Sequence, residues 1–171
     1  MEVEMKIRGL MMDPITNMPI VILKEASGNA ILPIWVGVSE ANAIALEIEK
    51  VVTPRPMTHD LLKNIIEGFQ AQVARIVVND LKDNTFYAVI TINLNGSEVL
   101  IDARPSDAIA LALRVNAPIF VAEKVIEEAK SIEFTEQVAS GEREGENMPE
   151  SVDWKKWLEN LKPEDFDKYE L

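Results

Sequence analysis

The sequence predicts an α+β fold in which helices pack on a mainly antiparallel or mixed sheet. Strand-like runs follow one another with turn residues between them, as in "MPIVILKEASGNAILPIWVGV", which is typical of hairpins. Apolar residues at helical spacing recur between these runs. A strand, turn, strand and helix pattern occurs twice, ending in "NAIALEI" at 42–48 and "DAIALAL" at 107–113. We therefore expect one sheet, several packed helices and a candidate duplicated unit.

The N-terminal third indicates three strands and one helix. Apolar residues alternate in "VEMKI", and "MPIVILK" and "AILPIWVGV" form two further runs joined through residues 27–29, so the last two strands should be a hairpin. Ser39 is the expected N-cap of a helix whose apolar residues recur every three or four positions. Pro54 and Pro56 follow it, and proline ends a helix because it lacks an N–H donor.

The middle of the chain predicts a second helix and three more strands. Thr58 is the expected N-cap, and an apolar stripe continues from Leu61 to Phe69. "VARIVVNDL", "NTFYAVITINL" and "SEVLID" then indicate strands. The last two are joined by Asn95-Gly96, the dipeptide best suited to a type I′ hairpin turn. These three strands should form an antiparallel meander.

A third helix should run from Ala103 to Val115, with Arg104 or Ser106 at its cap position. "APIFV" then predicts a short buried strand, and a short acidic helix is expected over 123–130. Both copies of the repeated pattern end in helices that are apolar on nearly every side, so these helices should be buried on both faces.

The predicted domain organisation has three parts. Residues 1–133 form the α+β domain, and residues 134–150 form an acidic linker rich in Gly, Glu and Ser. Residues 151–171 form an amphipathic helical tail that carries Trp154, Trp157, Leu158 and Leu161.

Composition restricts the possible functions. The chain has no cysteine and a single histidine, which excludes disulfides and makes a structural zinc site very unfavourable. The formal net charge is −12, which argues against a basic surface for nucleic acid. The first residues lack the basic and continuous apolar regions of a signal peptide, and no apolar run reaches membrane-spanning length. We therefore expect a cytoplasmic protein without a membrane segment.

The stretch "DARPSDAIALAL" gathers the strongest candidates for chemistry. One interpretation is structural: Asp107 lies at the positive end of the helix dipole, and Arg104 pairs with a nearby carboxylate. The other is functional: Asp102 and Asp107 hold a divalent cation, Mg²⁺ or Mn²⁺, beside a phosphate-binding Arg104. In the other copy of the repeat, Ser39 and Asn42 occupy the places of Arg104 and Asp107.

His59 and Asp60, in "PRPMTHDLL", are the second group of candidates. With one histidine in the chain, a two-histidine acid–base pair is impossible. A hydrolase would therefore depend on metal-bound water, with His59 as a ligand or single proton shuttle. The alternative is a local hydrogen bond at a helix start. Asp83, in "LKDNTFYA", is most simply explained as a turn residue.

Five segments together resemble the bifunctional nuclease domain family: "AILPIWVGVSEANAIALEIE", "PRPMTHDLL", "LKDNTFYAVI", "IDARPSDAIALALR" and "APIFV". The resemblance covers about residues 1–122, and "WLENLKPEDFDKY" also resembles extensions on stand-alone bacterial members. It implies a compact α+β domain, homodimers, and nuclease activity on RNA and DNA, as in plant members. The candidates at the family's polar positions are His59, Asp60, Asp83, Asp102, Arg104 and Asp107.

Two hypotheses follow. In the first, the protein is a divalent-metal-dependent nuclease: Asp102 and Asp107 hold Mg²⁺ or Mn²⁺, Arg104 binds phosphate, and His59 or Asp60 assists the attacking water. In the second, it is a non-catalytic homodimeric module whose polar residues act as helix caps and subunit ion pairs. The first needs the polar groups to converge in one place.

Overall fold

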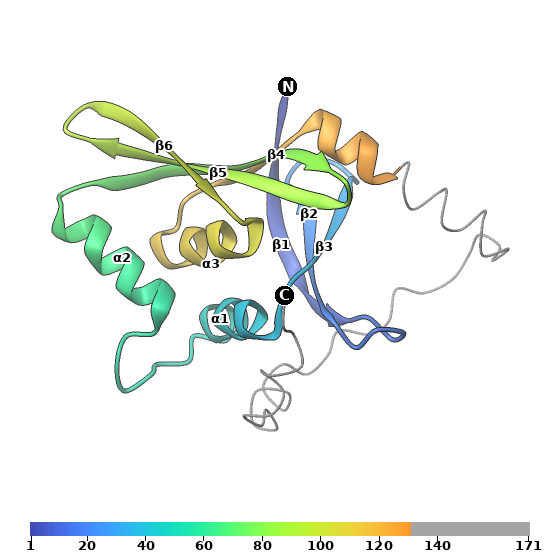
Figure 1. Ribbon diagram of the computed structural model, residues 1–171, viewed down its shortest axis with the longest axis horizontal. Coiled ribbons are helices and arrows are strands. Elements are labelled where there is room, and N and C mark those ends of the chain that lie inside the picture. The colour runs from blue at the N-terminus through green and yellow to red at the C-terminus, as the bar shows by residue number, and fades with distance from the viewer. Residues whose placement is uncertain (131–171) are drawn as a thin grey trace, which may run out of the picture.

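The computed structural model describes residues 1–130, which form a seven-stranded mixed sheet with helices (Figure 1). This confirms the predicted α+β class. The strands are β1 (Glu2–Met12), β2 (Pro19–Glu25), β3 (Ile31–Trp35), β4 (Gln72–Lys82), β5 (Thr85–Leu94), β6 (Ser97–Ala103) and β7 (Ile119–Ala122). The helices are α1 (Val38–Ile48), α2 (Thr58–Gly68), α3 (Pro105–Val115) and a final segment over 123–130.

The sheet consists of two three-stranded meanders joined by one short strand. Its order is β3-β2-β1-β7-β4-β5-β6. β7 pairs antiparallel with β1 and parallel with β4, and the other neighbours are antiparallel. The first meander leads into α1 and the second into α3, so the two repeated patterns lie at opposite edges of the sheet (Figure 1).

The core lies between the sheet and the helices. Its residues include Val21, Leu23, Ile76 and Val78 of the sheet, together with Ile44 of α1 and Ile109 of α3. Six apolar residues of α3 are buried, as expected for a helix that is apolar on nearly every side. α2 differs, because His59 is its only buried residue.

All three helix starts differ in part from the prediction. α3 begins at Pro105 with Arg104 as its N-cap, one of the two expected caps, whereas Ala103 is the last residue of β6. The N-cap of α1 is Gly37, not Ser39, and no side chain caps it. A β-carbon at Gly37 would collide with the folded-back carboxylate of Glu40, so glycine leaves room for an acid at the positive end of the helix. The N-cap of α2 is Met57, not Thr58, because the Asp60 carboxylate accepts a hydrogen bond from the Met57 N–H at 2.8 Å.

The predictions for the linker at 134–150 and the tail at 151–171 lie outside the described residues. Within residues 1–130, no helix has both the length and the apolar character required to cross a bilayer.

Candidate functional site

The starts of α2 and α3 bring two predicted residues into contact. His59 Nε2 lies 2.9 Å from Asp107 Oδ1, across 48 positions of sequence. The His59 side chain is nearly buried, whereas that of Asp107 is 29% exposed. The hydrogen bond from His59, aided by Arg104, outweighs the effect of burial and holds the pKa of Asp107 below its ordinary value of 3.8. Asp107 is therefore ionised at neutral pH.

The charge of Asp107 fixes the form of the histidine. An ionised carboxylate has no proton to donate, so Nε2 of His59 carries the proton in this contact. If His59 is neutral, its Nδ1 is then the proton-accepting atom of the ring. A single carboxylate thus selects the tautomer that leaves one ring nitrogen able to act as a base.

Arg104 lies on the solvent side of this pair. Its Nε donates to Asp107 Oδ2 at 2.8 Å, and one terminal nitrogen lies 2.9 Å from Glu40 Oε1. Its side chain is 62% exposed. A guanidinium has five N–H donors, and these two contacts use only part of them. Glu40 was not among the predicted residues, since nothing in its local sequence shows that α1 and α3 start side by side.

Asp60 has a different partner from His59. Arg114 donates from Nε to Asp60 Oδ1 at 2.6 Å, and to the carbonyl oxygens of Ala110 at 2.9 Å and Ala43 at 3.0 Å. The Arg114 side chain is 4% exposed. Burial raises the pKa of Asp60, but the bonds from Met57 N–H and Arg114 lower it more, so the pKa lies below 3.8. Asp60 thus joins α2 to the other two helices.

Arg114 was also missed, although the sequence carries a signal for it. It is the only charged residue in the run "AIALALRV", and an arginine within an apolar helix is rarely buried without a partner. It lies seven residues after Asp107, or two helical turns. Adjacent residues of α2, His59 and Asp60, therefore bridge to successive parts of α3.

Asp102 is not brought to this cluster. In β6 it pairs with Val89, whereas the next residue, Ala103, pairs with the fully buried Ala88 and packs against the core. Successive residues of a strand point to opposite faces, so Asp102 lies on the face of the sheet away from α3. Asp83 lies in the turn between β4 and β5 with a φ of 48°, a conformation that Asp tolerates in turns.

The described residues do not fit the predicted metal site. Asp107 already accepts hydrogen bonds at both oxygens, from His59 and Arg104, and Asp102 faces the other way. Among residues 1–130, no group of three or more His, Asp or Glu side chains is placed to hold a metal ion. Asp102 and Asp107 therefore do not share a site for Mg²⁺ or Mn²⁺.

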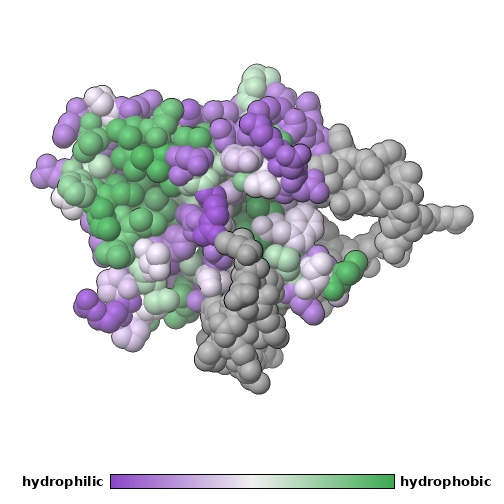
Figure 2. All heavy atoms as spheres, in the orientation of Figure 1, coloured by the Kyte–Doolittle hydropathy of each residue, from purple (hydrophilic) through white to green (hydrophobic). Residues whose placement is uncertain are grey.

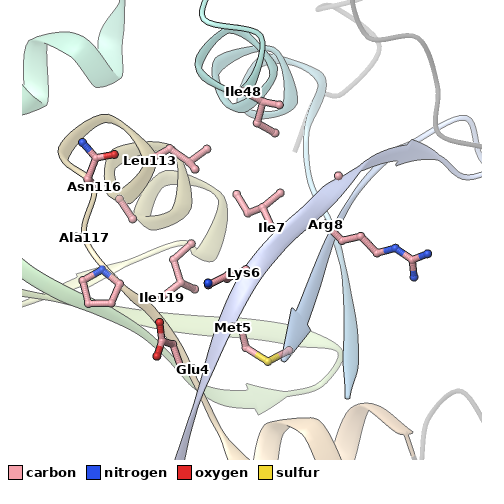
Figure 3. Close-up of a pocket in the computed structure, with 13 residues that line it drawn as sticks. Glu4, Met5, Lys6, Ile7, Arg8, Ile48, Leu113, Asn116, Ala117 and Ile119 are labelled. Carbon is pink, nitrogen blue, oxygen red and sulfur yellow. The ribbon is translucent and has the colours of Figure 1, made fainter. Parts of the chain in front are cut away.

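Cavities lie beside the helices, and one of them reaches the cluster. A cavity of about 280 Å³ is lined by Arg104, Ser106 and Trp35, together with residues 84–86. A cavity of about 480 Å³ lies between β1 and the ends of α1 and α3. In Figure 3, Ile7, Ile48 and Leu113 point into the latter and Arg8 points away. The candidate residues do not line this larger cavity, so the smaller cavity beside Arg104 is the more relevant one.

The fold and the cluster together define an α+β domain in which a His–Asp pair and an exposed arginine meet at two helix starts. The sequence model of the bifunctional nuclease domain matches residues 21–133, and the chain belongs to that family. All the candidate residues lie within the matched range.

The chain is also similar to two individual proteins. An uncharacterized protein of Mycobacterium tuberculosis is 38% identical over 166 residues, which cover 95% of this chain and 97% of that protein. Bifunctional nuclease 1 of Oryza sativa subsp. japonica is 25% identical over 109 residues, which cover 62% of this chain and 33% of the rice protein. The match to the rice protein thus spans about a third of its length.

Proposed function

We propose that this protein is a nuclease that hydrolyses phosphodiester bonds of RNA or DNA at the cluster of His59, Asp107 and Arg104. Membership of the family and the match to rice Bifunctional nuclease 1 support nuclease-related chemistry. The observation that carries the proposal is the position of Arg104, a half-exposed cation with unused donors, directly beside the His59–Asp107 pair.

Each residue of the cluster has its own role in the proposed hydrolysis. Arg104 binds the phosphate and stabilises the charge that develops on its oxygens. His59 accepts the proton of the attacking water while the new P–O bond forms and the ester P–O bond breaks. The departing oxygen takes up a proton from solvent water, and His59 returns its own proton to solvent. Asp107 holds the histidine ring in the required tautomer, and Asp60 positions α2 through Arg114 and does not touch the substrate.

The test is cleavage of end-labelled single-stranded RNA and DNA by the purified full-length protein. Loss of a charge-stabilising donor costs about 10²–10³ in rate, so Arg104→Gln should lose that much activity. A general base contributes about 10²–10⁴, so His59→Gln should lose a comparable factor. Arg75→Gln is the matched control, because Arg75 pairs with Glu2 elsewhere on the surface.

Wild-type rates in both site variants, or activity that separates from the protein on chromatography, would disprove the proposal. Parallel reactions with Mg²⁺, Mn²⁺ or EDTA test the expected metal dependence. Activity that persists in EDTA agrees with the donor set described above. Activity that needs the metal would show that the ligands differ from Asp102 and Asp107 as they are now placed.

The second hypothesis, a non-catalytic homodimeric module, is favoured by one specific observation. The acids of the cluster are already paired, Asp107 and Glu40 with Arg104 and Asp60 with Arg114, as structural ion pairs would be. Folded protein that cleaves neither RNA nor DNA under any of the metal conditions would favour this alternative. The homodimer and the cytoplasmic location stay predictions under either hypothesis.

A further inference from the structure

The cavity beside Arg104 lies where three parts of the fold meet. Its volume is about 280 Å³. Trp35 lines it from the end of β3, residues 84–86 line it from the β4–β5 turn and the start of β5, and Ser106 lines it from the first turn of α3. The proposed hydrolysis uses Arg104 alone among these residues. The rest of the cavity is therefore free to bind another part of a substrate.

Trp35 is one of three well-exposed aromatic residues in the described part of the chain, with 47% of its area exposed. The others are Phe69 and Tyr87, and the ring of Tyr87 already has a lysine ammonium 5.6 Å from its centroid. Neither of these two lines the cavity. The Nε1–H of Trp35 donates to Asp13 Oδ2 at 3.1 Å, so the polar edge of the indole already has a partner. The remaining exposed ring is a flat apolar surface.

Two polar side chains in the cavity can form hydrogen bonds with a ligand. Ser106 is only 7% exposed, and its hydroxyl forms no hydrogen bond with any other group of residues 1–130. Because Ser106 lines the cavity, a ligand there can reach this hydroxyl. Asn84 is exposed in the turn before β5, with a φ of 59°, and its amide carries both donors and an acceptor. These groups can bond to the edge of a polar, planar ligand.

The charges around the cavity favour an uncharged ring next to a phosphate. Arg104 is the only charged residue among the described residues that line it, and it already pairs with Glu40 and Asp107. The chain has a formal net charge of −12, so long-range attraction does not draw a polyanion to it. Much of the affinity for nucleic acid must then come from uncharged contacts. Stacking of a base on an aromatic side chain is a contact of this kind.

The exposed apolar face of α2 is less suited to this role. Figure 2 shows apolar side chains gathered on the side of the molecule that carries α2 and the β5–β6 hairpin. They include Leu61, Ile65 and Ile101, which are 53%, 46% and 41% exposed, and aliphatic side chains have no π surface on which a base can stack. Phe69 follows the last residue of α2, about 15 Å along the helix from His59.

We propose that the cavity binds one nucleobase of a single-stranded nucleic acid, stacked on Trp35, while Arg104 holds the adjoining phosphate. This inference rests on the proposed nuclease function, and it identifies the substrate as an unpaired strand. Bases of single strands are recognised by stacking on aromatic rings and by hydrogen bonds to their edges. Trp35 supplies the ring, and Asn84 and Ser106 supply the hydrogen-bonding groups.

The size of the cavity fits one base and not a base pair. Its volume of about 280 Å³ lies just below the range of about 300–1,000 Å³ found for pockets that hold drug-sized ligands. A base within a duplex is paired along its edge and stacked on both faces, so it must be unpaired and unstacked before it can enter such a pocket. A single strand avoids this cost.

The experiment measures binding separately from cleavage. The full-length protein is titrated into a short, end-labelled single-stranded phosphorothioate DNA that resists hydrolysis, and fluorescence anisotropy gives the Kd. Loss of stacking on one base weakens binding about 5- to 100-fold, so Trp35→Leu should lose this factor. Trp35→Phe keeps an aromatic ring and should recover most of the affinity. Tyr87→Leu is the matched control, because Tyr87 is a similarly exposed aromatic residue outside the cavity.

A strand with the same linkages but without bases separates stacking from phosphate binding. The wild type should bind this abasic probe as weakly as Trp35→Leu binds the normal probe, and Trp35→Leu should lose nothing further on it. A duplex of the same sequence should bind at least about 10-fold more weakly than the single strand. Equal affinity for normal and abasic strands, or no binding by the wild type, would overturn the proposal.

The salt dependence of binding is an independent check. One phosphate held by Arg104 predicts that log affinity falls with log salt concentration with a slope of about −0.7. A slope steeper than about −2 would assign the affinity to several cations and overturn the role of the base. Thermal unfolding shows whether each variant is folded. If Trp35→Leu does not fold, the abasic, duplex and salt measurements still decide, because they use the wild type.

Cleavage kinetics distinguish failure of this proposal from failure of the nuclease function. Trp35→Leu should raise KM for a single-stranded substrate and leave kcat nearly unchanged, because stacking holds the substrate equally before and during the reaction. Base-dependent binding without any cleavage would support the base site and refute the nuclease. Cleavage with a KM that Trp35→Leu does not alter would support the nuclease and refute the base site.

Discussion

Helices α2 and α3 have the same length and are bonded to each other, yet they are stabilised by opposite means. Eight of the eleven residues of α3 are buried, and most of them are apolar. Only His59 is buried in α2. α3 is held by the apolar core, whereas α2 meets that core through the partly buried Ile66 and is joined to α3 by two polar bridges at its N-terminal end. In α2, polar residues at the helix start thus make the contacts with α3, because most of its apolar stripe is exposed.

The largest effect on stability is expected at Arg114, the buried cation that binds Asp60 of α2. Arg114→Met should lower the free energy of unfolding by about 3–5 kcal/mol, the usual cost of breaking a buried ion pair. It removes the bond to Asp60 and those to two carbonyl oxygens. Urea unfolding followed by circular dichroism measures it. Arg75→Met is the control, since an exposed ion pair contributes about 0–1 kcal/mol. Equal losses of stability in the two variants would show that the buried Arg114 pair stabilises the fold no more than an exposed pair does.

A second pair of substitutions compares the two helices directly. Ile109 is fully buried in α3, whereas Ile65 in α2 is 46% exposed. Ile109→Ala should cost about 2–5 kcal/mol because it leaves a cavity in the core. Ile65→Ala should change stability by about 0.5 kcal/mol or less, when measured at concentrations where both proteins are monomeric. A cost above 2 kcal/mol at Ile65 would mean that the α2 stripe packs against the chain itself.

The sequence predicted the sheet and the buried helix well because their signals are local. The meander of β4, β5 and β6 follows from alternating residues and an Asn-Gly turn, and the burial of α3 from its apolar run. The direction in which the apolar stripe of α2 faces could not be predicted. The stripe shows that a helix forms, but which side meets the core depends on residues far away in the sequence.

The contacts within the candidate site could not be predicted from the sequence for the same reason. His59 and Asp107 were predicted separately and the structure joins them, but their 48-residue separation hides the contact from any local pattern. Glu40 and Arg114 were missed because their partners lie on other helices. Asp102 shares a motif with Asp107, yet the alternation of the strand carries it to the other face of the sheet.

A smaller effect is expected at the contact between His59 and Asp107. His59→Ala removes one hydrogen bond, but Asp107 keeps its bond to Arg104. The loss of a bond to a charged group should cost about 1–3 kcal/mol. Unfolding in urea at neutral pH measures it, and hydrogen exchange should place the change in α2. An unaltered stability would show that Arg114 alone docks the helix.

The smallest expected effect is on the pH dependence of stability. Asp107 and Asp60 have pKa values below 3.8 in the folded protein, so the unfolded chain binds protons more readily than the folded one. Their contribution is therefore fully present above pH 3.8 and is lost as the pH falls through the folded values. Asp107→Asn cannot titrate at this position, so the difference in stability between it and the wild type should narrow below about pH 4. Urea unfolding from pH 6 down to pH 2.5 measures this difference, and a constant gap would show that Asp107 gains nothing from His59 and Arg104 in its charged form. Because both acids lie at the junction of α2 with α3, a pH below about 4 should loosen α2 before it disturbs the apolar packing of α3.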